Sequence, residues 1–197
     1  MGFWNFRNVA PSTPQQLKNR GWVIMFCNTV NRASTMESFA SGNLNAHAIR
    51  LNSGSELGPS LEAAALKAME ASDCSSAFVL SAVGSVDFIR LRMANANRSN
   101  EEANDIKEWR KRFEIVSLVG TFSNSGKHLH MSLSDAEGNV VGGHLVSGRV
   151  FTTVELVIGT IKNVSFDREF DALTGYRELA VKQIVPNQSV RKETELE

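Results

Sequence analysis

Three of the chain's four histidines, His128, His130 and His144, lie within the short stretch 127–145. Neutral imidazole nitrogens bind Zn²⁺, Ni²⁺, Cu²⁺ and Fe²⁺, and three protein ligands with an open fourth position are the pattern of catalytic zinc sites. If the three rings converge, the sequence predicts a divalent transition-metal site, with zinc as the expected ion. The alternative is three polar side chains on a solvated face or on a face between subunits.

A β-hairpin is the element that would bring these histidines together. Residues 128–134 alternate histidine or serine with leucine or methionine, the period of a strand with two unlike faces. The turn sequence 135–138, Asp-Ala-Glu-Gly, is typical of a type I turn followed by a left-handed glycine. A three-residue loop sets His130 opposite His144 on one face of the sheet. A two-residue loop, or a bulge at residues 142–143, would turn His144 to the other face.

One acidic and two basic residues stand among apolar residues and are candidates for a site. Glu155 stands inside an apolar stretch, where a carboxylate suits a group that orients a metal ligand or acts as a general base. An ion pair with Arg149, Arg112 or a neighbouring subunit explains it as well. Arg90 and Arg92 alternate with apolar residues, which fits either an anion pocket or an exposed sheet face.

The segment 104–112, NDIKEWRKR, combines positive charge with an aromatic ring that can stack on a base. It is the best candidate in the chain for contact with nucleic acid. The alternative is an ordinary charged surface beside a strand. The residues of this candidate are Lys107, Trp109, Arg110 and Arg112.

The composition limits the classes of partner. The chain has 21 basic and 21 acidic residues and a pI near 6.9, so it lacks the charge excess for a bulk electrostatic grip on DNA or an anionic membrane. No apolar run approaches the ~18–20 residues of a membrane span. Cys27 and Cys74 are too few for a disulfide framework and are typical of free thiols in a reducing compartment. We therefore expect an intracellular protein, cytoplasmic in the first instance.

The hydrophobic pattern predicts an α+β fold with a largely antiparallel sheet of about seven strands and one main helix. Gly58-Pro59 opens the helix, which ends near residues 72–73. Gly84-Ser85 is expected to turn the chain between two strands, and 94–105 is expected to be a surface loop. The predicted strands are 46–51, 77–83, 86–93, 112–122, the two arms of the histidine hairpin, 150–161, 165–170 and 176–181.

Three regions follow from the composition along the chain. Residues 1–44 are poor in acidic residues and rich in serine and asparagine, so they form either an unstructured extension or a targeting segment of the mitochondrial transit type. Residues 45–184 hold the predicted elements and form the folded domain. Residues 185–197 are charged and form a flexible tail.

Several long stretches resemble a known family. RFEIVSLVGTFS, GKHLHMSLSDAEGNVVGGHL and TTVELVIGTI, followed by F-x-R-E-F-D-x-x-T-G-Y-x-E-L, are similar to the PPC domain, the "plants and prokaryotes conserved" domain, over residues 47–181. The resemblance implies one helix-flanked antiparallel sheet that assembles as a homotrimer. The chain resembles the single-domain form, because the Arg-Gly-Arg-Pro core of an AT-hook is absent from it.

The resemblance also bears on partners. Plant members contact partner transcription factors through a Gly-Arg-Phe-Glu-Ile-Leu-like motif, which corresponds here to residues 111–116, with Arg112, Phe113 and Glu114 retained and Lys111 and Val116 in place of glycine and leucine. Plant members typically lack the histidines, so the fold does not need them.

The leading hypothesis is a homotrimeric binding module with a metal site near a subunit interface. If the site is catalytic, we expect a metal-activated water to act on a small molecule. The alternative is a regulatory protein, nuclear like the plant relatives, that contacts DNA or transcription factors.

Overall fold

The computed structural model describes residues 38–94 and 104–185, which form eight strands and one α-helix. The predicted α+β class, a largely antiparallel sheet with one main helix, is confirmed. The elements are β1 Leu44–Asn52, α1 Leu57–Ser72, β2 Ala77–Arg92, β3 Ile106–Trp109, β4 Phe113–Ser123, β5 Gly126–Ser134, β6 Val140–Ile161, β7 Val164–Asp171 and β8 Tyr176–Gln183.

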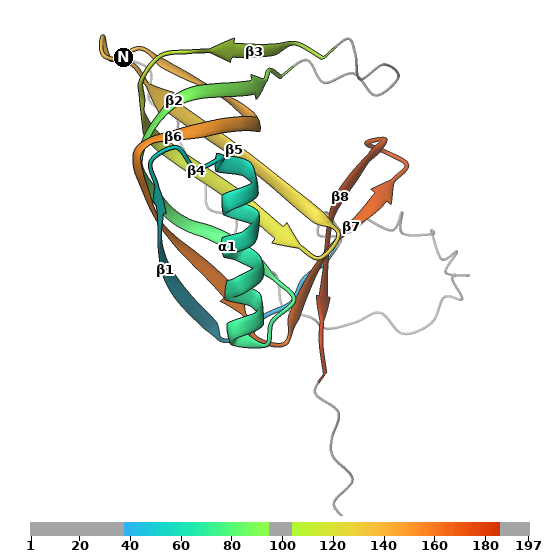
Figure 1. Ribbon diagram of the computed structural model, residues 1–197. Coiled ribbons are helices and arrows are strands. Elements are labelled where there is room, and N and C mark those ends of the chain that lie inside the picture. The colour runs from blue at the N-terminus through green and yellow to red at the C-terminus, as the bar shows by residue number, and fades with distance from the viewer. Residues whose placement is uncertain (1–37, 95–103, 186–197) are drawn as a thin grey trace, which may run out of the picture. The chain divides into compact units, whose positions relative to one another are not determined.

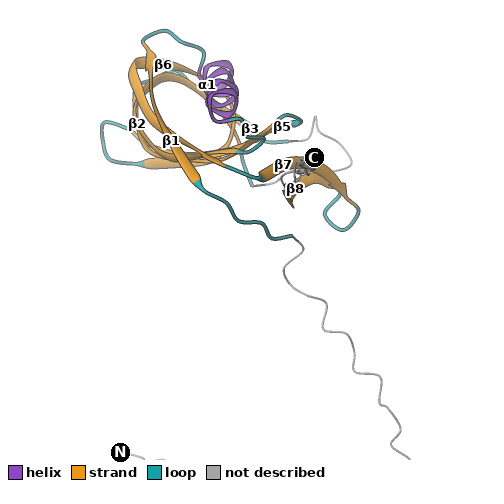
Figure 2. Ribbon diagram, turned by 90° about the horizontal axis from the view of Figure 1, so that it is seen from below, coloured by secondary structure: helices purple, strands orange, loops and turns teal. Residues whose placement is uncertain are grey.

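The main sheet has six strands in the order β1-β6-β5-β4-β2-β3, with every pair antiparallel. An additional pairing of β2 with β6 closes β6, β5, β4 and β2 into a ring, and Figure 2 shows the strands curling around. The long strand β6 makes this closure because it pairs with β5 over Val140–His144 and with β1 over Thr153–Ile161. The strands therefore share one continuous core.

The helix α1 packs along the outside of β6 and also touches β1 and β2 (Figure 1). Its buried side chains recur at the spacing of one helical face, and Asp73 ends the helix in a left-handed conformation with φ 49°. The predicted start at residues 58–59 and end at 72–73 agree with the observed helix. The side chains that it buries in the core are Leu57, Leu61, Ala65, Ala68 and Met69.

The strand β5 has one face in the core and one face outside it. Leu129, Met131 and Leu133 are at most 2% exposed and belong to the core cluster. Because successive side chains on a strand point to opposite faces, His128 and His130 must project from the outer face of the sheet.

The strands β7 and β8 form a separate two-stranded hairpin that stands beside the main sheet (Figure 1). It is joined to that sheet by side chains at the β4–β5 turn, where the Ser125 hydroxyl accepts a 2.9 Å hydrogen bond from Arg168 N and donates one to the Asp167 carboxylate. Arg168 itself is only 8% exposed. The hairpin therefore lies against the outer face next to His128, while His130 stays exposed.

The predicted turn at Gly84-Ser85 is wrong, because β2 runs without interruption through both residues. Gly84 has φ 137°, and a Cβ there would lie 2.1 Å from Thr153 O of β6. The glycine thus permits a local shift of the β2–β6 register and close approach of the two backbones. The second arm of the histidine hairpin and the predicted strand 150–161 are likewise one strand, β6.

The short strand β3 is an element that the sequence analysis missed, since it lies in the segment considered for nucleic acid. Most of the predicted loop 94–105 lies outside the described residues, as do most of the predicted extension 1–44 and tail 185–197. Within residues 38–94 and 104–185, α1 is the only helix, and it is too short and too polar to cross a membrane.

Candidate metal centre

The hairpin β5–β6 has the register that its turn sequence predicts. Asp135 N donates to Asn139 O at 3.0 Å, Gly138 has φ 81°, and His130 is the Cα partner of His144. The Asp135 carboxylate accepts hydrogen bonds from Asn139 N at 2.8 Å and from Lys111 Nζ at 2.8 Å, contacts that lower the pKa of Asp135 to about 2. Asp135 therefore stabilises the turn, and the turn aligns the histidines.

The three imidazoles lie together on the outer face of the sheet. Their centroids are 4.9 Å apart for His128 and His130, 5.1 Å for His128 and His144, and 5.4 Å for His130 and His144. One ligand nitrogen from each ring lies within 4.8 Å of the others. Among the residues that the structure describes, this is the only group of three or more histidine, cysteine or acidic side chains with metal-binding geometry.

The spacing of two of the ring nitrogens is close to that around a first-row divalent ion. His128 Nε2 and His130 Nε2 are 3.0 Å apart. Two nitrogens bound tetrahedrally to zinc at ~2.0–2.1 Å would be roughly 3.3–3.4 Å apart. The pair therefore needs to open by only a few tenths of an ångström to hold an ion between them.

Burial keeps two of the rings neutral, the form that binds metal. Desolvation lowers the pKa of His144 to about 4, and the nearby positive charge of Arg92 adds to the effect. Desolvation also lowers the pKa of His128, followed by the charges of Arg168 and His130, while Glu178 opposes the shift. At neutral pH both side chains offer a lone pair rather than a positive charge.

One ring nitrogen of the cluster is buried without a partner. His144 Nδ1 makes no hydrogen bond with any part of the chain that the structure describes. A buried polar atom without a hydrogen bond destabilises the fold, because it has lost its hydration and no other group replaces the hydrogen bond to water. The cluster therefore fits a metal ion, which would supply a partner for a ring nitrogen.

The sequence analysis did not include Arg168 of β7 in this site. Its Nη2 donates to Thr121 Oγ1 at 2.8 Å, and its Nη1 lies 3.5 Å from His128 Nδ1. At 3.5 Å the second contact is too long to fix the tautomer of His128, whose Nε2 stays on the side of the cluster. Arg168 belongs to the F-x-R-E-F-D motif noted in the sequence, but the motif does not indicate which strand the Arg168 side chain contacts.

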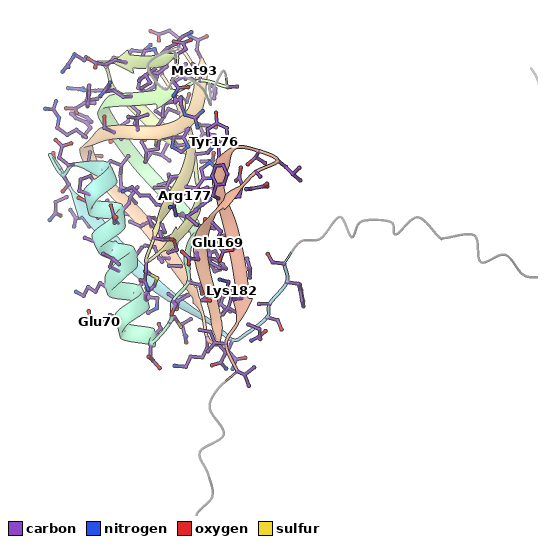
Figure 3. All side chains as sticks on the ribbon, turned by 90° about the vertical axis from the view of Figure 1, so that its right-hand side faces the viewer. Glu70, Met93, Glu169, Tyr176, Arg177 and Lys182 are labelled. Carbon is purple, nitrogen blue, oxygen red and sulfur yellow. The ribbon has the colours of Figure 1, made fainter. Side chains whose placement is uncertain are left out.

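A pocket of about 350 Å³ lies beside the histidines, between the β4–β5 turn and the β7–β8 hairpin. Figure 3 shows Tyr176 and Arg177 near the turn of that hairpin, with Glu169 and Lys182 further along it. Arg92 also lines the pocket, in agreement with the anion-pocket alternative, whereas Arg90 pairs with Glu108 at 3.7 Å. The side chains of the site that line this pocket are Arg92, His128, His144, Arg168, Arg177 and Glu178.

The structure does not bring Glu155 to the histidine cluster. Glu155 is exposed, pairs across the sheet with Arg50, and follows His144 by roughly 36 Å along β6. Arg149, one of the partners considered for it, makes a 2.8 Å ion pair with Asp87 instead. Arg112 stacks over Phe151, with its guanidinium carbon 4.2 Å from the ring centroid.

In the candidate segment for nucleic acid, Trp109 and Arg110 contact other residues of the chain. Trp109 packs edge-on against Phe113, with centroids 6.4 Å apart, and Phe113 is 2% exposed. Arg110 pairs with Glu108 at 2.8 Å and lies over the Phe88 ring. Lys107 and Glu114 are exposed. The fourth histidine, His47, lies elsewhere, with Nε2 2.8 Å from Ser72 Oγ.

Fold and site together define a small α+β domain whose closed antiparallel sheet carries a histidine cluster on its outer face. Residues 38–162 match the model of one family, described as the Plants and Prokaryotes Conserved (PCC) domain. The chain belongs to this family, which is the PPC domain that its sequence resembles.

Two curated relatives illustrate the range of the family. The bifunctional protein GlmU of Synechococcus sp. (strain JA-3-3Ab) is 33% identical over 153 residues, which cover 77% of this chain and 23% of that protein. The AT-hook motif nuclear-localized protein 13 of Arabidopsis thaliana is 35% identical over 94 residues, 42% of this chain and 20% of that protein. The chain thus spans less than a quarter of the length of the curated relatives it matches.

Solved structures share the fold along nearly their whole length. A hypothetical protein from Salmonella has a TM-score of 0.66 and 30% identity, covering 74% of this chain and 99% of the other. A protein from Archaeoglobus fulgidus described as metal-containing has a TM-score of 0.60 and 27% identity, covering 74% of this chain and 99% of the other.

Proposed function

We propose that the chain is a homotrimeric PCC-domain binding module that holds a divalent transition metal, zinc in the first instance, through His128, His130 and His144. The observation that carries the proposal is the convergence of three ring nitrogens within 4.8 Å on one face of a hairpin. The unpartnered His144 Nδ1 and the metal-containing relative from Archaeoglobus fulgidus support it.

Three protein ligands leave room for a further ligand beside the histidines. When bound, a zinc ion supplies Lewis acidity at that position. The chain's own residues determine what can approach it: Arg168 places a buried positive charge next to His128, and Glu178 is the acidic group in the wall of the same pocket. A small molecule, rather than a polymer, suits a pocket of about 350 Å³.

The metal proposal is tested by dialysing the purified chain against zinc after chelation and measuring bound metal per chain. We expect one ion per chain and its loss in His130→Ala. His47→Gln is the matched control, because it removes the histidine that lies outside the cluster and is expected to keep the ion. A wild-type chain that retains no zinc under these conditions contradicts the proposal.

The homotrimer is what the family resemblance implies, and apolar side chains exposed on β2 and β4 support contact between copies. Val83 is 59% exposed, Val116 56% and Val119 54%, and contact between copies would remove such surface from water. Light scattering coupled to gel filtration is expected to give about 65 kDa, three chains of 21.6 kDa. A mass of one chain contradicts the assembly and leaves the metal site to be judged separately.

A regulatory role through DNA or transcription factors is the second candidate, favoured by the match to the Arabidopsis AT-hook protein. The surface for it would be the 107–114 segment, with Lys107, Arg110, Arg112 and Glu114 exposed and Trp109 and Phe113 packed behind them. Titration of an AT-rich duplex at physiological salt tests direct contact. A Kd weaker than ~10⁻⁴ M, beyond ordinary non-specific binding, contradicts it.

A further inference from the structure

The pocket beside the histidines has an excess of positive charge. Arg92, Lys127, Arg168 and Arg177 line it, against the single carboxylate of Glu178. Lys127 is paired with Glu62 outside the pocket. Three guanidinium groups therefore share the wall with one acid, an arrangement that attracts anions.

Arg168 is the buried member of this group. Its Nη2 donates to the hydroxyl of Thr121 at 2.8 Å, and its Nη1 lies 3.5 Å from His128 Nδ1. No salt bridge among residues 38–94 and 104–185 includes Arg168. Glu178, in the wall of the same pocket, is the acidic group whose charge acts on Arg168. A charge that is 8% exposed and forms no salt bridge is costly, and an anion in the pocket would offset that cost.

The geometry of the neighbours keeps Arg168 in place. Its backbone N donates to Ser125 Oγ at 2.9 Å, and its carbonyl accepts from Arg177 Nη1 at 3.0 Å. The β4–β5 turn and β8 thus hold the backbone of Arg168, and Thr121 of β4 holds its guanidinium, before any ligand arrives. A planar, fixed guanidinium is suited to bidentate binding of a carboxylate or a phosphate.

We propose that this pocket binds a small-molecule oxyanion, a carboxylate or a phosphate, that Arg168 holds next to the histidine cluster with Arg92 and Arg177 at its edges. The inference deepens the proposed function by naming the ligand class of the same site, and it rests on that function only for the metal beside the ligand. Residues of the β7–β8 hairpin form one wall of the pocket, and its volume of about 350 Å³ favours a free small molecule over the phosphate backbone of a duplex.

The test is calorimetric titration of inorganic phosphate and of malonate into the full chain, once chelator-treated and once zinc-loaded, at low ionic strength. We expect saturable binding of at least one anion, and the tighter of the two identifies phosphate or carboxylate as the natural group. Arg168→Lys keeps the charge but loses the bidentate fork, so we expect about tenfold weaker binding. Arg92→Gln is expected to weaken binding by about threefold, and it serves alone if Arg168→Lys does not fold.

Arg50→Gln is the matched control, because Arg50 is an exposed arginine on β1 that does not line the pocket. Equal weakening by Arg50→Gln and Arg168→Lys, or binding of neither anion in either state, overturns the inference. Anion binding by a chain that never takes up zinc supports the inference while the metal proposal fails. Zinc uptake without binding of either anion overturns the inference while the metal proposal stands. Binding of an AT-rich duplex by a chain that binds neither phosphate nor malonate also overturns it.

Discussion

His130 lies directly across the hairpin from His144, and this one pairing decides whether the outer face carries a three-nitrogen cluster. It depends on the three residues between Asp135 and Asn139, because side chains alternate between faces and a slip of one residue reverses them. The histidine cluster is thus a consequence of turn chemistry at the far end of the same hairpin.

Deletion of Glu137 should therefore abolish metal binding from a distance. A two-residue loop moves the β6 register by one residue and directs His144 to the opposite face. Glu137→Ala keeps the loop length and is expected to bind zinc like the wild type. Bound zinc per chain, measured after dialysis, separates the two variants. Equal zinc content in both would mean that the hairpin register does not organise the site.

The metal-free chain should lose stability as the pH falls from about 6.5 to about 4. The folded-state pKa of His144 is lowered to about 4 from its ordinary 6.5, so the unfolded chain binds a proton first. The contribution is fully present above pH 6.5 and declines toward pH 4, by on the order of 1–2 kcal/mol after allowance for partial exposure.

Urea unfolding at several pH values measures this decline. His144→Asn removes the titrating group, so its free energy of unfolding should fall less between pH 6.5 and 4 than that of the wild type. A parallel decline in both chains would assign the effect to other groups.

Two glycines should respond in opposite directions to a side chain. Gly84→Val places a β-branched residue at φ 137° and a Cβ 2.1 Å from Thr153 O, so we expect a loss of at least about 3 kcal/mol in the free energy of unfolding. Gly58→Ala lies in the first turn of α1 with no atom within 4 Å of the new Cβ. It should be neutral or stabilising by up to about 1 kcal/mol. Similar losses in both variants would contradict the close approach of β2 and β6.

The local sequence carries enough information for the hairpin and the helix. Alternation over 128–134, the turn at 135–138 and the proline at the start of α1 act within a few residues of each other. They predicted the register of His130 and His144 and both ends of the helix. The hydrophobic pattern predicted the fold class, and the resemblance to the PPC domain implied a similar helix-flanked sheet.

Relations between distant segments could not be read in the same way. Gly84 indicated a turn because glycine is frequent in turns. Its actual role is to let the backbone of β6 approach, and that strand is far away in the sequence. Arg168 reaches His128 only because the β7–β8 hairpin lies against the outer face of the sheet. Alternation places Arg168 on a strand but does not tell which neighbour that strand covers. The pocket beside the histidines therefore became visible only in the structure, where Arg168 joins Arg92, His128 and His144, which were considered beforehand, in its wall.

The most direct test of the metal site is X-ray absorption at the zinc edge of the zinc-loaded chain. Three imidazole ligands are expected, with nitrogen at ~2.0–2.1 Å and the outer-shell pattern of histidine rings. His130→Ala and His144→Ala should each remove about one imidazole or release the ion. A spectrum with sulfur or only oxygen neighbours, or one unchanged in both variants, would contradict a site built from His128, His130 and His144.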